Sequence, residues 1–178
     1  MRVSLTKGVY TALSSVVELR GVNIMKGKGQ QSTIYDVAKY IIDNFGPMSA
    51  MKLQKLAFYS QAMALVWDDV PIFEDDFEAW SKGPVCRTLF QAHKGMFMIE
   101  SAEFLDIYKP DINRISEDHK DTINAVCNSL KDVSGYELSQ MTHSERPWID
   151  ARDGLPVGAH CDRIISKQSM EEYYQGNW

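Results

Sequence analysis

The sequence contains no run of about 18 consecutive apolar residues, the length that a membrane-spanning helix requires. Cysteine is scarce: Cys86, Cys127 and Cys161 are an odd number of thiols without the dense spacing of a secreted disulfide scaffold. The N-terminus offers no uninterrupted apolar stretch for a secretion signal, because Thr11 and Glu18 break it. We therefore expect a cytoplasmic protein with no membrane partner.

Motifs of common catalytic sites are missing as well. The sequence has no glycine-rich phosphate loop, no G-x-S-x-G turn and no H-E-x-x-H zinc motif. The run His160-Cys161-Asp162 could supply a thiol or a metal ligand, and His143 and Asp150 are further candidates. Zinc ligands, however, usually stand two to four residues apart, whereas adjacent side chains point in different directions. We predict no catalytic residue, no metal and no cofactor, and keep a metal-dependent or thiol enzyme as an alternative.

The net charge is −5, and its distribution favours a protein partner. Residues 1–24 hold Arg2, Lys7 and Arg20 against Glu18 alone, so a segment of charge +2 precedes a body of charge −7. An acidic body repels phosphate backbones, which makes nucleic acid an unfavourable partner.

A length of 178 residues with 44% hydrophobic and 24% charged residues is typical of one globular domain. The glycine-rich, polar run MKGKGQQ at residues 25–31 has nothing to bury and indicates a linker. We therefore expect residues 1–31 to be a flexible N-terminal extension and residues 32–178 to be the domain. Met25 is a candidate for the native start, since Arg20-Gly21 can be encoded by AGAGGA, a ribosome-binding sequence; the alternative is a genuine N-terminal arm. If translation starts at Met25, residues 1–24 are dispensable.

Two helices are predicted at the start of the domain. Apolar residues recur every three or four positions over residues 34–45, and Thr33 is a suitable N-cap. A glycine–proline pair ends that helix, and Ser49 can cap a second helix over residues 50–67. The second helix is apolar nearly all round, which is typical of a helix in the middle of a bundle.

Short β segments are expected among the later helices. Alternating apolar residues predict strands at residues 77–80, 104–108 and 163–165, and residues 82–85 indicate a turn into a helix. Later helices are indicated around residues 123–133, from a capping box at Ser134, and from Ser166 or Ser169. The predicted fold is mainly α (α+β): a compact helical bundle with a small short-stranded β element.

The first two helices superficially resemble a helix-turn-helix, with Lys52 and Lys55 at the start of the second. A recognition helix must expose one face to a DNA groove. Because the second helix is apolar almost all round, burial is the better account, and a DNA-binding regulator is kept only as an alternative.

Four blocks of the sequence stand in an order that is typical of a known family. The first is KLQKLAFYSQ at residues 52–61, and the second is PIF followed by FEAWSKGPV within residues 71–85. The third is LSQMTHSERPW at residues 138–148, and the fourth closes the chain within residues 165–174. These blocks are similar to KLQKL-x-YY-x-Q, P-L-F, F-x-A-W-x-x-G-P-V, L-S-x-x-T-H-x-x-x-P-W and I-S-x-x-x-[ILM]-x-x-Y-[FY] of the Panacea family, which includes SocA-like antitoxins and phage-associated GepA-like proteins. Residues 34–174 therefore resemble a SocA-like Panacea domain.

The resemblance implies an antitoxin of a type II-like toxin–antitoxin system. Such domains neutralise a partner toxin by direct protein–protein binding, and the SocA-like branch delivers its toxin to a AAA+ protease as a proteolytic adaptor. Neither role needs catalysis. The implied partners are a cognate toxin and, for an adaptor, the protease.

The motif residues fall into two expected groups. Residues expected to pack or shape turns are Leu53, Leu56, Gln61, Trp80, Gly83, Pro84, Thr142, His143, Pro147 and Trp148. Candidates for partner binding are polar or amphipathic residues in or beside the two strongest blocks, and we expect their polar ends to be exposed. These candidates are Lys55, Tyr59, Lys82 and Arg87.

Overall fold

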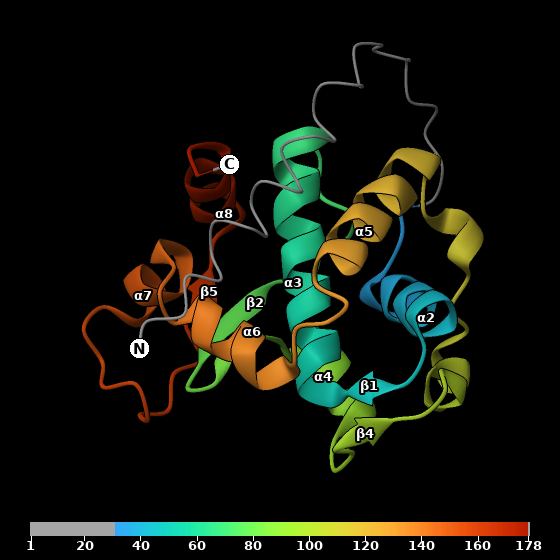
Figure 1. The fold of residues 1–178 in the computed structure, drawn as a ribbon, viewed down its shortest axis with the longest axis horizontal. Helices are drawn as coiled ribbons and strands as arrows, with labels where there is room; N and C mark the ends of the chain where they lie inside the picture. Colours follow the sequence, from blue (N-terminus) through green and yellow to red (C-terminus); the bar gives the residue numbers. More distant parts are fainter. Residues whose placement is uncertain (1–30, 178) are drawn as a thin grey trace.

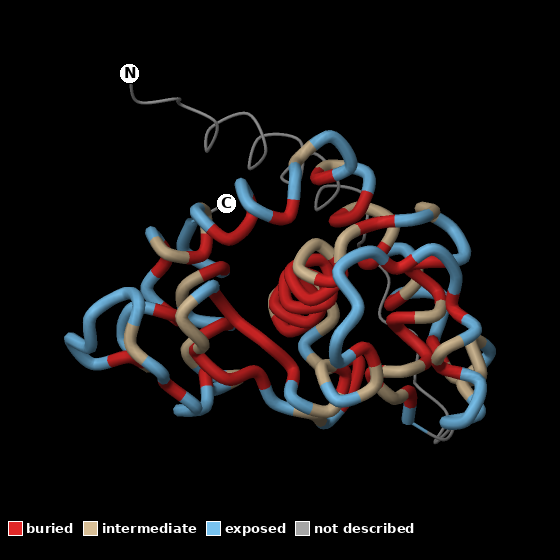
Figure 2. Tube along the Cα trace, turned by 90° about the horizontal axis from the view of Figure 1, so that it is seen from below, coloured by how far each residue is buried: buried red, intermediate tan, exposed pale blue. Residues whose placement is uncertain are grey.

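The long helix α3, Ala50–Trp67, runs through the middle of the molecule, and the other elements pack around it (Figure 1). The computed structural model describes residues 31–177. Figure 2 shows α3 as a buried coil enclosed by the rest of the chain. Of its 18 residues 14 are buried, which confirms the prediction of a central core helix. The expectations for residues 1–24 and for Met25 lie outside the described residues.

The predicted helices are present, together with a short helix at residues 146–152 that was not predicted. The α-helices within residues 31–177 are α2 (Ile34–Phe45), α3, α4 (Arg87–His93), α5 (Glu117–Ser129), α6 (Gly135–Thr142), α7 (Arg146–Arg152) and α8 (Lys167–Gln175). Two 3₁₀ helices, η1 (Glu103–Tyr108) and η2 (Ile112–Arg114), connect β4 to α5. Helices α2, α5, α6 and α8 pack directly on α3.

The predicted caps explain where the first helices begin. A capping box opens α2: Thr33 Oγ1 accepts a hydrogen bond from Asp36 N at 3.3 Å, and Asp36 Oδ2 accepts one from Thr33 N at 2.7 Å. Gly46, at φ +78°, ends the helix in a conformation that other residues rarely adopt. Ser49 Oγ then accepts a hydrogen bond from Lys52 N at 3.1 Å and caps α3.

The β element is small and antiparallel. Strand β2 (Phe77–Trp80) lies between β3 (Gly83–Cys86) and β5 (Ile164–Ile165), with Phe77 opposite both Cys86 and Ile165. A separate two-residue ladder joins β1 (Met48–Ser49) to β4 (Met98–Ile99). The prediction of mainly helical structure with a short-stranded β element is confirmed.

Two local predictions are corrected. Residues 104–108 form the 3₁₀ helix η1 instead of a strand, since backbone bonds such as Leu105 N to Ala102 O at 2.9 Å close one turn and point Leu105 into the core. Residues 83–86 are a strand and not only a turn. Gly83 takes φ +98°, which lets the chain reverse tightly after β2 and pair with it.

Placing a charge in α3 should unfold the protein. Leu56 is 1% exposed, so Leu56→Asp would bury a carboxylate without a partner and lower the free energy of unfolding by about 3–5 kcal/mol. Urea unfolding measures this loss. The matched control Asn128→Asp adds the same charge at an exposed position of α5 and should unfold like the parent. An unchanged midpoint for Leu56→Asp would contradict the core position of α3.

Candidate partner-binding pocket

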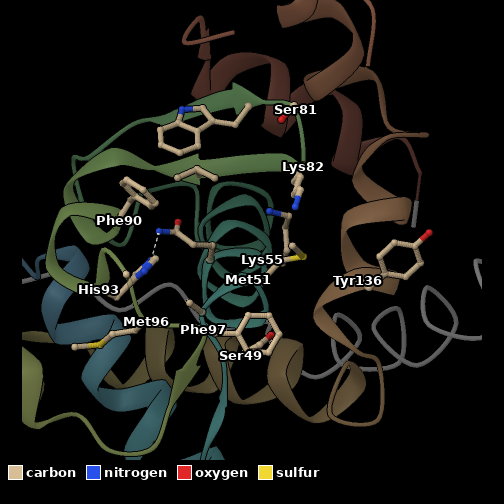
Figure 3. Close-up of a pocket in the computed structure, with 15 residues that line it drawn as sticks. Ser49, Met51, Lys55, Ser81, Lys82, Phe90, His93, Met96, Phe97 and Tyr136 are labelled. Atoms are coloured by element: carbon tan, nitrogen blue, oxygen red, sulfur yellow. Dashed lines mark hydrogen bonds between the residues drawn. The ribbon is translucent and has the colours of Figure 1, made fainter. Parts of the chain in front are cut away.

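A pocket of 580 Å³ opens at the N-terminal end of α3 (Figure 3). Its walls come from α3, the β2–β3 turn, α4, the segment that leads into β4, and the start of α6. Most of the lining is apolar, and no aspartate or glutamate takes part in it. Pockets that combine apolar walls with a few polar groups are the usual form of a binding site.

Large apolar side chains stand exposed on the rim of this pocket. Phe97 is 81% exposed and Tyr136 is 70% exposed, while Met96 is exposed to a smaller degree. The segment that carries Phe97 is held in place, because Phe97 O accepts a hydrogen bond from Ala50 N at 2.9 Å and β4 pairs with β1. The exposed ring is therefore presented by a fixed backbone.

The polar end of the pocket is formed by Lys55, which is only 1% exposed. Its Nζ donates a hydrogen bond to Pro84 O at 2.9 Å. The backbone at Gly83 lies so close to Lys55 and Thr142 that a Cβ on Gly83 would be 2.6 Å from both Lys55 Cε and Thr142 Oγ1. Burial lowers the pKa of the Lys55 amine to about 7, because the surrounding protein solvates the charged form poorly.

Gln54, which precedes Lys55 in α3, forms a buried hydrogen-bond network that extends to the His93 side of the pocket. Gln54 Oε1 accepts from Cys86 N at 2.8 Å, and Gln54 Nε2 donates to Cys86 O at 3.2 Å. Gln54 Nε2 also lies 3.0 Å from His93 Nε2, the contact drawn in Figure 3. Burial lowers the pKa of His93, which favours a neutral ring that can accept this hydrogen bond. The network joins α3 to β3 and α4.

The structure corrects the expected exposure of two partner-binding candidates. Lys55 is buried at the pocket's polar end, and Tyr59 is buried deeper in the core. Tyr59 Oη lies 3.0 Å from Glu145 Oε2, and Tyr174 Oη lies 2.6 Å from the same oxygen. Exposure was expected because both residues have polar ends. In fact both residues belong to a helix that is buried nearly all round, and their polar ends bond to Pro84 and Glu145 in neighbouring segments.

The other two candidates are exposed as expected. Lys82 lies on the β2–β3 turn and lines the pocket. Arg87 is outside the lining, and its guanidinium is held by Glu78, with Nε 2.6 Å from Oε1 and Nη2 3.0 Å from Oε2. Its Cζ also stands 5.9 Å from the centre of the Trp80 ring. Of the four candidates, Lys55 and Lys82 therefore share the pocket.

The motif residues expected to shape the fold lie at contacts between elements. Gln61 accepts from Ile72 N at 2.8 Å and donates to Phe73 O at 2.7 Å, which fixes the loop after α3. Trp148 Nε1 donates to Trp80 O at 2.8 Å and joins α7 to β2.

Around Trp148, His143 stacks on the indole at a ring-centre distance of 4.3 Å. Arg152 covers the ring with its Cζ 4.8 Å from the centre and donates to Ala79 O at 2.7 Å. The remaining residues of this group are buried: Leu53, Leu56, Gly83, Pro84, Thr142 and Pro147.

Sequence reasoning missed the apolar rim and three buried polar residues. Residues 96–99 read MFMI, an apolar run bounded by Gly95 and Glu100, and this run was the available signal for an exposed patch. Gln54 and Glu145 carry no comparable signal, because their partners are distant in sequence. Arg152 bonds both to the distant Ala79 O and to carbonyls of the loop that follows it, including Pro156 O and Ala159 O.

The thiols do not favour nucleophilic chemistry. Burial raises the pKa of Cys86 and of Cys127 to about 12, which suppresses the reactive thiolate. Cys161 is buried as well, while its neighbours His160 and Asp162 are exposed. Among residues 31–177 no group of three or more histidine, cysteine, aspartate or glutamate side chains is placed to hold a metal ion.

The described helices also allow the expectations about DNA binding and membrane spanning to be compared with the structure. The face of α3 that would have to enter a DNA groove is covered by other elements. None of the helices in the described part of the chain has the length and apolar character that spanning a membrane would require.

The buried amine of Lys55 should make stability depend on pH. Between pH about 7 and about 10.4 the unfolded chain holds the Lys55 proton and the folded chain has lost it, so the free energy of unfolding rises with pH by up to about 1.36 kcal/mol per unit. Below pH about 7 both states hold the proton, so the full cost of burying the charged amine lowers the free energy of unfolding. In Lys55→Met this pH-dependent increase in the free energy of unfolding should be absent, and the variant should be more stable than the parent at pH 7. Urea unfolding from pH 7 to 9.5 measures it, with exposed Lys82→Met as control; equal pH slopes for parent and Lys55→Met would contradict the buried amine.

Comparison with known proteins identifies the family. The family model described as antitoxin SocA-like, Panacea domain, matches residues 53–149, which run from α3 into α7 and include the polar end and the exposed rim at residues 96–97. Comparisons with curated proteins and with solved structures give no match. The matched region is more than half of the sequence, and it contains the first three motif blocks almost completely. The chain therefore belongs to the SocA-like Panacea antitoxin family.

Proposed function

We propose that this protein is an antitoxin that neutralises a partner toxin by direct protein–protein binding at the pocket. The observation that carries the proposal is the apolar pocket with large, exposed side chains on its rim, most of which lies inside the region that matches an antitoxin family. Exposed apolar patches of this kind often mark protein interfaces. Binding of this type needs no catalytic residue.

The energetics of the rim favour a protein partner. Phe97 and Tyr136 are rigid rings, so burying them under a partner removes apolar surface from water at a small cost in side-chain entropy. A few such anchors commonly supply most of the affinity of an interface. We infer that Phe97 is the principal anchor, because its ring is the most exposed of those on the rim and its backbone is fixed by Ala50.

Binding of the toxin at the pocket is compatible with two ways of neutralising it. A stable complex would block the toxin directly, whereas an adaptor would carry the bound toxin to a AAA+ protease. Both require the toxin to bind first, so the binding face is the part of the proposal to test. Toxin levels with and without the protease then distinguish the two outcomes.

Growth rescue and affinity test this proposal. Co-expression of the protein should relieve growth inhibition by a toxin encoded beside it, and the pair should co-purify without added nucleotide or metal. Phe97→Ala should weaken binding by about thirtyfold if it removes an anchor of about 2 kcal/mol, and rescue should fall accordingly.

The matched control is Ile107→Ala, because Ile107 is 78% exposed and does not line the pocket. It should bind and rescue like the parent, and both variants should keep the parent's melting curve. Loss of rescue by Ile107→Ala with full rescue by Phe97→Ala would overturn the assignment of the face. Failure of the intact protein to rescue growth would overturn the antitoxin proposal.

A further inference from the structure

The Lys55 amine has spare hydrogen-bonding capacity at the end of the pocket. A protonated amine donates three hydrogen bonds. Among residues 31–177, Lys55 Nζ has one acceptor within hydrogen-bond distance, Pro84 O, and no carboxylate within 4.0 Å. The side chain is 99% buried and lines the cavity. The described chain thus buries the Lys55 amine without a counter-charge, and a bound carboxylate would stabilise its protonated form.

Lys82 adds a second amine at the same end of the pocket. Figure 3 shows the Lys55 and Lys82 side chains on the same side of the pocket, the side away from His93. Lys82 is exposed, so it stands at the mouth while Lys55 lies deeper. The pocket lining thus carries two lysine amines and no acidic group, within a chain of net charge −5.

No acidic group of the described chain neutralises this end. The pocket lining contains no aspartate or glutamate, and the nearby Glu78 already pairs with Arg87 at 2.6 Å. A buried charge is strongly unfavourable unless an opposite charge or several hydrogen bonds compensate it. An incoming carboxylate would supply both the charge and the missing acceptors.

We propose that the pocket binds an aspartate or glutamate side chain of the partner toxin, with flanking apolar residues packed on the rim formed by Met96 and Phe97. The carboxylate would contact Lys55 and Lys82, and the apolar flanks would cover the exposed side chains. This proposal rests on the function proposed above and assigns the chemistry of the contact.

The lining favours a side chain over a free chain terminus. A glutamate side chain reaches a recessed amine through its methylenes, so its backbone stays at the mouth. A chain terminus would carry its last peptide group into walls that are mostly apolar and offer few polar partners.

Three capped peptides test the proposal directly on the full-length protein. The probes are acetyl-Phe-Glu-Leu-amide, acetyl-Phe-Gln-Leu-amide and acetyl-Phe-Leu with a free carboxyl terminus, titrated into the protein and followed by NMR. The glutamate peptide should bind at least tenfold more tightly than the glutamine peptide. Equal affinities for these two, or tightest binding by the free terminus, would overturn the proposal.

Variants of the protein assign the preference to the two amines. Lys55→Met should abolish the preference for glutamate, and Lys82→Gln should reduce it. Lys109→Gln removes an exposed positive charge that is not in the pocket lining and should leave it unchanged. Lys55→Met is expected to be stable at pH 7, and a melting curve checks this. A preference that survives in Lys55→Met would contradict the role of the buried amine.

Failure of the proposed carboxylate site can be distinguished from failure of the antitoxin proposal. If Phe97→Ala loses rescue but glutamate is not preferred, the antitoxin function stands and the carboxylate site falls. If glutamate is preferred but no adjacent toxin is neutralised, the carboxylate site stands and the antitoxin function falls.

Discussion

The burial of α3 on nearly all sides is the constraint on which the rest of the structure depends. A buried polar side chain on such a helix has little access to water, and several of those on α3 are hydrogen-bonded to other elements. Gln54 binds Cys86 in β3, and Gln61 binds the loop at Ile72 and Phe73. Tyr59 reaches Glu145 before α7. One helix thus fixes the positions of segments that are distant in sequence.

Lys55 is also buried on α3, but its amine has only one hydrogen-bond partner. This incomplete pairing favours a binding role for the pocket over a gap in the packing. The Lys55 amine has Pro84 O as a partner, yet it lines a cavity whose other walls are largely apolar. An apolar side chain of similar length would fill the position without the cost of desolvating a charge. The cost is consistent with a site that is completed by an acidic partner, and the exposed Phe97 beside it provides apolar surface for the same partner.

Much of the fold could be predicted from the sequence, because its main signals are local. Periodicity and caps at Thr33 and Ser49 predict α2 and α3, and the ordered motif blocks predict the family. One local element and the site were harder to predict. The short apolar run at residues 104–108 suits either a strand or a 3₁₀ helix. The exposure of Lys55 depends on how closely β3 approaches α3, and sequence spacing carries no information on that distance.

The most direct test of the account is amide hydrogen exchange of the protein with and without its toxin. If the toxin covers the pocket, its binding should slow exchange at residues 94–99 and at the start of α6 around Tyr136. Residues 104–108 and α8 should exchange as in the free protein. Protection confined to α8 or to residues 104–108, with unchanged exchange at residues 94–99, would contradict the account.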